Sequence, residues 1–221
     1  MPDEKAQKQT KPRKKTQDKA PEHIVFPDNY WIFAADLSLK RPGFCRIHVH
    51  KTEGSPAEFT KVNCMSVDNK TDTKKTHGQL LDEIFYAMGD FKPHPREGEG
   101  VVDKIFYVRE HAFNARGSMK EMGIFEVVGV TNFWAYQHGE SQWHEIYPVQ
   151  IKKLITGNGK ALKEEVAEGL KKYLPDLQFK NDDESDATAV AIAWLIQHGE
   201  LEQIESEKQN EESNNDKGNT P

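Results

Sequence analysis

The chain has 221 residues and a hydrophobic fraction of 36%, which is enough for one domain with its own core and polar tails. Its 36 acidic and 30 basic residues give a net charge of -6, which argues against a simple nucleic-acid coat protein. Its only cysteines, Cys45 and Cys64, form neither a disulfide framework nor a Cys-x-x-Cys metal site, so we expect reduced thiols in an intracellular protein.

The two ends of the chain are polar and differ in charge. Residues 1–22 are rich in lysine and have no aliphatic residue larger than Ala after Met1, whereas residues 200–221 are rich in Glu, Asn and Gln. We expect a disordered basic arm and a disordered acidic tail around a folded domain of residues 23–199. The arm either contacts phosphates or is a solvated end. No apolar run approaches the roughly 20 residues that span a bilayer, so we expect no membrane association.

The first part of the folded domain has the pattern of a three-stranded meander. Residues 30–36 form an aromatic and aliphatic run that ends in Asp36, which is typical of a buried strand with an acid at its tip. Arg41, Pro42 and Gly43 supply turn residues. Two further strands are predicted to follow, over residues 44–50 and 58–67.

Helices and strands alternate in the rest of the domain. In chain order we predict a helix over 79–88, a buried strand over 104–110 that ends in Glu110, a helix over 117–136, a short strand over 146–149 and a helix over 160–173. Three strands followed by such an alternation indicate a mixed α/β sheet.

A carboxylate cluster opens the last helix. Residues 181–186 read Asn-Asp-Asp-Glu-Ser-Asp and lead into an apolar run of small residues. Asp183 and Asp186, at i and i+3, project from one face of this helix and bring two oxygen donors together. The helix dipole offsets only part of their repulsion, so the pair favours a hard cation such as Mg²⁺. Taken alone, the cluster is explained equally well as an acidic helix cap.

The carboxylates at the strand tips and on the helix can form one site. Asp36 and Glu110 end strands that can lie side by side, and the helix with Asp183 and Asp186 can dock against them. A two-Mg²⁺ phosphodiester hydrolase needs such a set, because metals about 3.5–4 Å apart clamp the phosphate, activate a water and stabilise the leaving oxygen. The sequence therefore predicts this kind of centre, which requires no serine or cysteine nucleophile.

Four motifs in this order resemble the RuvC-like Holliday junction resolvases, which have the ribonuclease H-like fold. The motifs are Ile32–Asp36 with Pro42-Gly43-Phe44, Val108–Phe113, Ile151–Lys163, and Asp183–Ala187 before Ala189–Ile192. The resemblance covers nearly all of residues 30–197. It implies a ribonuclease H-like mixed five-stranded sheet flanked by helices.

The resemblance also assigns roles to individual residues. The catalytic, metal-binding acids that it implies are Asp36, Glu110, Asp183 and Asp186. It makes Lys152 and Lys163 contacts to the DNA backbone and Phe113 an aromatic that stacks near the crossover. A core position for Phe113 and solvated positions for the lysines are the alternatives. Asp182 leaves the third acid open, because Asp182 and Asp186 at i and i+4 would also share a face.

The activity implied by the resemblance is resolution of four-way junctions. We expect a homodimeric endonuclease that makes paired symmetric nicks in branched DNA with two Mg²⁺ ions per site, or Mn²⁺ in their place. It would act in the cytoplasm of a bacterium or a phage-infected cell, and the extensions at both ends favour a phage member. The alternatives are a broader fork and flap nuclease, a non-cleaving DNA-binding relative and an actin-like nucleotide-binding module. The last would have a Gly-rich phosphate loop, where the chain has Leu37-Ser38-Leu39-Lys40.

Overall fold

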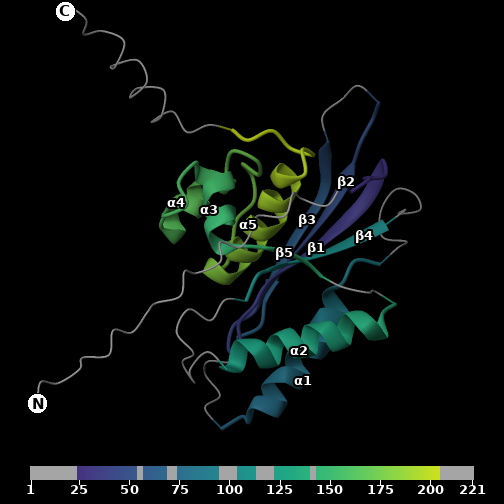
Figure 1. Ribbon diagram of the computed structural model, residues 1–221, viewed down its shortest axis with the longest axis vertical. Coiled ribbons are helices and arrows are strands. Elements are labelled where there is room, and N and C mark those ends of the chain that lie inside the picture. Colours follow the sequence, from purple (N-terminus) through teal and green to yellow (C-terminus); the bar gives the residue numbers. More distant parts are fainter. Residues whose placement is uncertain are drawn as a thin grey trace, which may run out of the picture.

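A five-stranded sheet forms the centre of the computed structural model (Figure 1). The structure describes residues 24–53, 57–68, 74–94, 104–112, 122–139 and 143–204. The strands are β1 (Asn29–Asp36), β2 (Gly43–His50), β3 (Glu58–Ser66), β4 (Lys104–Glu110) and β5 (His144–Ile146), in the order β3-β2-β1-β4-β5. β1 to β3 form an antiparallel meander, and β4 runs parallel to both β1 and β5. The predicted mixed α/β sheet is confirmed.

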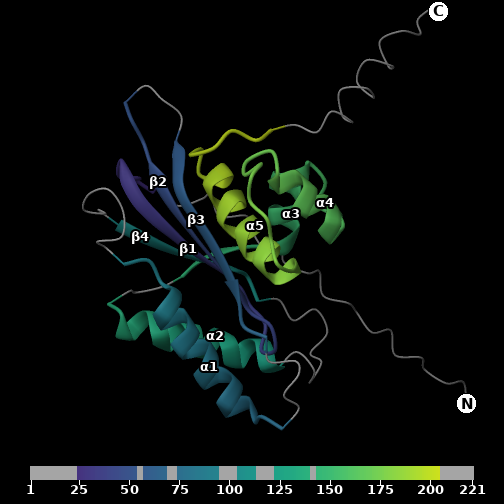
Figure 2. The ribbon, with the colours of Figure 1, turned by 180° about the vertical axis from the view of Figure 1, so that it is seen from behind.

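Helices cover both faces of the sheet. They are α1 (His77–Phe91), α2 (Met122–Gln137), α3 (Pro148–Thr156), α4 (Lys163–Leu170) and α5 (Asp182–Gln197). α1 and α2 lie on one face, and α3, α4 and α5 lie on the other, as the views from the front and from behind agree (Figures 1 and 2). None of the helices in the described ranges combines the length and the hydropathy that a membrane span needs.

The central strand β1 is buried on both faces and separates two hydrophobic cores. Tyr30, Ile32 and Ala34 belong to the core under α5, whereas Phe33 and Ala35 belong to the core that includes α1 and α2. This alternation follows from the two-residue period of a strand. An apolar run without polar interruptions, as in β1, is therefore what a strand enclosed on both sides requires.

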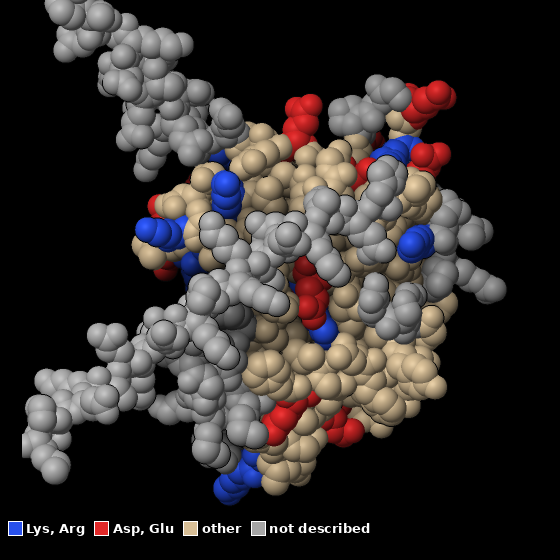
Figure 3. Space-filling model, viewed as in Figure 1, with Lys and Arg blue, Asp and Glu red and all other residues tan. Residues whose placement is uncertain are grey.

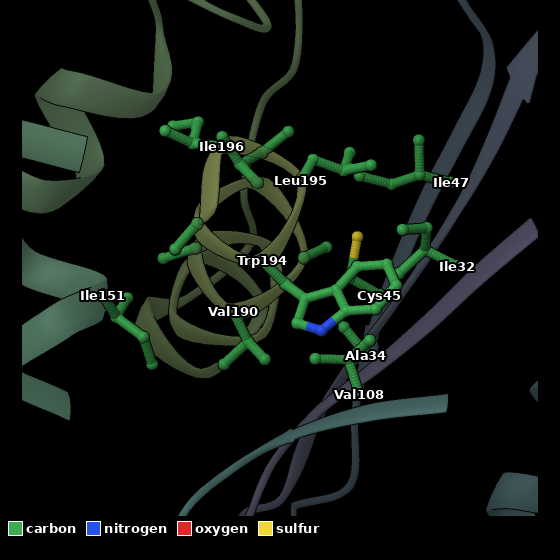
Figure 4. Packing of buried hydrophobic residues seen from close by; sticks show 14 of the residues in the cluster. Ile32, Ala34, Cys45, Ile47, Val108, Ile151, Val190, Trp194, Leu195 and Ile196 are labelled. Carbon is green, nitrogen blue, oxygen red and sulfur yellow. The ribbon is translucent and has the colours of Figure 1, made fainter. Parts of the chain in front are cut away.

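Helix α5 is enclosed between the sheet and the helix pair α3 and α4. Its residues from Ala187 to Ile196 are all buried, which an apolar helix of this kind needs. Figure 4 shows Trp194 and Val190 packed beside Ile32 and Val108 of the sheet. The alanines of α5 have small side chains that let the neighbouring layers approach closely. The charged first turn of α5 is thus held at the edge of a core, as the sequence predicted.

Two predicted elements are wrong in their bounds. The strand predicted over 146–149 ends at its first residue, because Pro148 has no N–H for a strand ladder and instead occupies the first helical position of α3. The helix predicted over 160–173 is shorter at both ends. It begins after Leu162, whose N–H donates to the Glu165 carboxylate at 2.7 Å and so marks the helix start.

The folded part continues beyond the predicted boundary at residue 199. The Tyr30 hydroxyl donates to Glu200 Oε2 at 2.7 Å, and Lys51 Nζ lies 3.0 Å from the same oxygen. The N–H of Ile204 donates to the Tyr173 hydroxyl at 2.9 Å. The first residues of the predicted acidic tail therefore pack on the domain. The rest of that tail and the predicted basic arm lie outside the described residues.

Candidate active site

Asp36 and Glu110 lie next to each other at one edge of the sheet. They end β1 and β4, which are parallel neighbours paired up to the residue before each acid. Ala34 and Val108, two residues earlier on the two strands, face the core under α5. Because strand side chains alternate, both acids point toward the layer that contains α5. The predicted pairing of the two strand tips is thus observed.

The first turn of α5 is tied to the same edge of the sheet. Asn181 caps the helix by accepting a hydrogen bond from the N–H of Glu184 at 3.1 Å. The side-chain amide of Asn181 also donates to Ser66 Oγ at 2.8 Å, at the end of β3. The cap therefore fixes both where the helix begins and where its first turn sits on the sheet.

Gly43 allows α5 to approach the sheet closely. It pairs with Asp36 across β1 and β2. A Cβ atom on Gly43 would lie 1.9 Å from the backbone carbonyl oxygen of Asp183, a distance that no side chain tolerates. Glycine at this position thus brings the acidic turn of α5 against the strand that carries the first acid.

A pocket of about 240 Å³ opens where the strand tips meet α5. Five of the seven site residues predicted from the sequence line it: Asp36, Glu110, Lys152, Lys163 and Asp186. Apolar side chains of α3, α4 and α5 form the rest of its wall. Three carboxylates and two ammonium groups from five different elements therefore converge on one small cavity.

The turn between α3 and α4 brings Lys163 to the pocket that Lys152 of α3 also lines. Gly157 ends α3 in the left-handed conformation with φ of 80°. A Cβ on Gly159 would lie 3.0 Å from Val149 Cγ1, so this part of the turn packs tightly on α3 itself. Lys163 follows at the start of α4, and its ammonium donates to Asp186 Oδ2.

Burial and mutual repulsion raise the pKa values of the three lining acids. Burial, followed by the charges of Glu110 and Asp186, raises the pKa of Asp36 well above its ordinary value. Burial and the charge of Asp186 raise the pKa of Glu110 to about 7. Burial also raises the pKa of Asp186, although Lys163 acts in the opposite direction. The pocket as it stands therefore disfavours the charged forms of these three acids.

Asp183 is not among the residues that line this pocket, but it lies within electrostatic range. Its charge contributes to the raised pKa values of Asp36 and Asp186. Its Oδ2 atom lies 2.6 Å from Arg41 Nη2 in an ion pair. Within the described residues this buried oxygen accepts no well-directed hydrogen bond. The contact between Arg41 and Asp183 is therefore an ion pair without a well-directed hydrogen bond.

The ion pair of Arg41 was not expected from the sequence, in which this residue was predicted only as part of a turn. The sequence did contain a signal for this ion pair, because Arg41 directly precedes the Pro42-Gly43 turn and this turn returns the chain to Asp36. Asp182, the alternative to Asp183, is exposed, and its charge also reaches Asp186. Phe113 lies outside the described residues, so its role in stacking stays a prediction.

A second polar network supports the end of β4. The buried Arg109 donates to Glu145 Oε1 at 2.6 and 2.9 Å and to Thr131 Oγ1 at 2.7 Å. His111 Nδ1 lies 2.6 Å from Glu145 Oε2. The residues on both sides of Glu110 are therefore held by the same carboxylate, which restricts the strand tip between them.

The donors around the pocket fit hard divalent cations. Carboxylate oxygens are the ligands that Mg²⁺ prefers, and a bound cation would offset the burial and mutual repulsion that disfavour the charged forms of Asp36, Glu110 and Asp186. As they stand, no three acidic, histidine or cysteine groups in the described ranges are gathered closely enough to cage a metal ion. The Lys163 ammonium beside Asp186 is instead the nearest cation.

Comparison with known proteins identifies the family. Residues 36–194 match the family model "Crossover junction endodeoxyribonuclease RuvC". The RuvC protein of Sulfurovum sp. (strain NBC37-1) is 27% identical over 165 residues, which are 74% of this chain and 94% of that protein. The RuvC protein of Synechococcus sp. (strain CC9311) is 27% identical over 169 residues, which are 76% and 99% of the two chains.

A solved structure agrees with this match. The Thermus thermophilus RuvC structure has a TM-score of 0.53 and 17% identity to this chain, covering 79% of it and 99% of the other, which shows a shared fold. The resemblance drawn from four sequence motifs is thus confirmed. The chain belongs to the RuvC family of crossover junction endodeoxyribonucleases.

Proposed function

We propose that the protein is a metal-dependent endonuclease that resolves four-way DNA junctions by nicking two strands of like polarity. Family membership supports this activity. The observation that carries the proposal is the convergence of Asp36, Glu110 and Asp186 on one pocket, each with a raised pKa. Such a group of acids is unfavourable unless cations offset its charge.

The acids that would hold two Mg²⁺ ions, or Mn²⁺ in their place, are Asp36, Glu110, Asp183 and Asp186. Bound there, the ions would clamp the scissile phosphate, activate a water and stabilise the leaving oxygen. The chain presents these oxygens on two strand tips and one helix turn, which are rigid elements. Arg41 is placed to hold Asp183 in position until a ligand shares its charge.

Lys152 and Lys163 would neutralise DNA phosphates beside the acids. Both line the pocket, and the side chain of Lys163 is 59% exposed, so it can turn from Asp186 toward a bound phosphate. Burial acts to lower the pKa of Lys163, but its hydrogen bond to Asp186 and the charges of the nearby acids together outweigh burial and raise that pKa. Lys163 therefore stays protonated at neutral pH and can attract the DNA backbone.

The outer surface of α1 and α2 supports a homodimer. α2 contains one charged residue, Glu126, and the surface over this helix is largely uncharged in Figure 3. Four aromatic residues are exposed on the two helices, namely Tyr86, Phe125, Phe133 and Tyr136. Exposed aromatic surface of this kind marks a contact site. A two-fold dimer through it would match the two-fold symmetry of a four-way junction.

A cleavage assay on synthetic DNA tests the proposal. The purified protein is incubated with four-way junctions, forks, flaps and linear duplex, with Mg²⁺ or with a chelator. The proposal expects Mg²⁺-dependent paired nicks in the junction that a ligase can seal, and little cleavage of duplex. Equal cleavage of forks and flaps would indicate a general debranching nuclease. Junction binding without cleavage under any metal would indicate a non-cleaving relative.

A further inference from the structure

The two cysteines of the chain lie directly opposite each other in the sheet. Cys45 of β2 pairs with Cys64 of β3 across the antiparallel ladder, and their sulfur atoms are 3.7 Å apart. Both are free thiols. They are the only cysteines in the sequence. Neither belongs to the pocket described above, and nothing in the proposed reaction uses them.

The two thiols have different surroundings. Cys45 is fully buried in the core under α5, where Figure 4 shows it among aliphatic side chains and Trp194. Cys64 lies on the edge strand of the sheet and is partly exposed. Its sulfur also lies 3.1 Å from the hydroxyl of Thr188 on α5. Cys64 is thus the less buried residue of the pair, and Cys45 is enclosed beside it.

The two thiols also differ in the direction of their pKa shifts. The hydrogen bond with Cys45 lowers the pKa of Cys64 below its ordinary value, against the effect of burial. Burial raises the pKa of Cys45 well above its ordinary value. The lesser burial of Cys64 and the direction of its pKa shift both favour it as the thiol of the pair that reacts first.

We propose that Cys45 and Cys64 are a redox modification site that closes to a reversible disulfide when the protein meets a peroxide. The Cys64 thiolate attacks one peroxide oxygen, the O–O bond breaks, and Cys64 becomes a sulfenic acid with release of one water. The Cys45 sulfur then attacks the Cys64 sulfur, the S–OH bond breaks, and a second water leaves. Two thiols are oxidised by two electrons, and the peroxide is reduced to two waters.

The strands need only a small adjustment for this bond. Directly opposite residues in an antiparallel pair have Cβ atoms about 4.5–5.5 Å apart, whereas a disulfide requires about 3.5–4.5 Å. Closure therefore draws β2 and β3 together locally. It also removes the Cys64 thiol from Thr188, whose hydroxyl donates to the Glu184 carbonyl at 2.8 Å in the first turns of α5.

The same turns of α5 carry the acids of the pocket. Thr188 lies two residues after Asp186 on α5, so a shift at Thr188 would also displace this acid. We therefore expect the disulfide to slow junction cleavage while DNA binding persists. This expectation rests on the proposed function, whereas formation of the disulfide does not. Disulfides in reducing compartments are usually transient and regulatory, which is consistent with such a role.

Mass spectrometry of the full chain tests the modification. Reduced, desalted protein is treated with hydrogen peroxide, and intact mass, thiol alkylation under denaturing conditions and non-reducing electrophoresis are recorded. The expected product is a single chain, not cross-linked to another, whose mass is lower by two hydrogens. Neither of its cysteines should react with the alkylating reagent, and dithiothreitol should reverse both changes. In Cys45→Ala, Cys64 should instead gain an oxygen or a sulfenic-acid probe, without loss of two hydrogens.

Single-cysteine variants complete the test. Cleavage by the oxidised wild type should fall and recover with dithiothreitol, whereas Cys45→Ala and Cys64→Ala should not show this reversible loss. Two thiols that stay free in peroxide, or that link separate chains, would overturn the site. If the reduced protein fails to cleave junctions, the proposed function fails, but the mass result still decides the modification.

Discussion

Gly43 lies directly against the backbone of Asp183. A Cβ atom on Gly43 would lie 1.9 Å from the Asp183 carbonyl oxygen and 3.3 Å from Cβ of Ala187. Because Gly43 is also the strand partner of Asp36, this contact sets the distance between the first acid and the acidic helix. The carboxylate cluster thus depends on a residue that contributes no side chain.

Substitution of this glycine tests that dependence. Gly43→Ala forces α5 away from the sheet, so we expect a loss of about 1–3 kcal/mol in the free energy of unfolding and slower cleavage below the melting temperature. Thermal denaturation and single-turnover cleavage measure the two effects. Gly78→Ala is the matched control, because the added Cβ would meet only Thr76 Oγ1, at 3.9 Å, and the residue is exposed in the first turn of α1. Equal behaviour of both variants would refute the packing argument.

The raised pKa of Glu110 predicts how the stability of metal-free protein depends on pH. The pKa rises from 4.5 to about 7 on folding, so this contribution to stability is fully present below the lower value and is lost as pH rises through the upper one. The loss amounts to about 3 kcal/mol. Glu110→Gln should therefore become progressively more stable than the wild type across this range. Urea denaturation in a chelator at several pH values measures the difference, and a gap that does not change with pH would contradict the predicted pKa.

Lys163 should compete with metal ions for Asp186. Without DNA, its ammonium is the cation next to this carboxylate, so Lys163→Ala should bind Mg²⁺ or Mn²⁺ more tightly in calorimetric titration. Cleavage should nevertheless be slower, because a phosphate contact is lost. Lys160→Ala is the control, since Lys160 is exposed and does not line the pocket. Weaker metal binding in Lys163→Ala would mean that the lysine orders the site instead.

The aromatic surface of α2 should be required for dimer formation. Tyr136 is 78% exposed, so Tyr136→Glu leaves the monomer's own core intact while placing a charge in the proposed interface. Analytical ultracentrifugation should show a wild-type dimer and a monomeric variant. Val25→Glu, at a residue 77% exposed before β1, should remain a dimer. A monomeric wild type, or a dimeric Tyr136→Glu, would reject this interface.

Features governed by local periodicity could be predicted from the sequence. Apolar runs that end in Asp36 and Glu110 indicated the two strand tips, and their parallel pairing placed both acids at one edge. The acids and apolar body of α5 likewise indicated a helix held at the border of a core. The prediction of a strand over 146–149 was wrong, although Pro148 was a local signal against it, because proline is suited to the first position of a helix.

Contacts between distant segments could not be predicted in this way. The ion pair of Arg41 with Asp183 and the approach of Gly43 to α5 join residues far apart in sequence. Such contacts leave no periodic pattern, because each depends on how two complete elements pack. The extension of the fold to Glu200 was missed for the same reason, since a single charged residue is held by two distant partners, Tyr30 and Lys51.

Single-turnover cleavage of a four-way junction in Mg²⁺ by Asp186→Asn and Asp182→Asn tests the central claim most directly. Asp186 lines the pocket, whereas Asp182 is exposed one turn earlier on α5. We expect Asp186→Asn to retain less than about a tenth of wild-type cleavage while binding the junction as tightly or more tightly, because it loses a charge that repels phosphate. Asp182→Asn should cleave at close to the wild-type rate. Cleavage by Asp186→Asn at the wild-type rate, or equal loss in both variants, would contradict the assignment of the pocket as the active site.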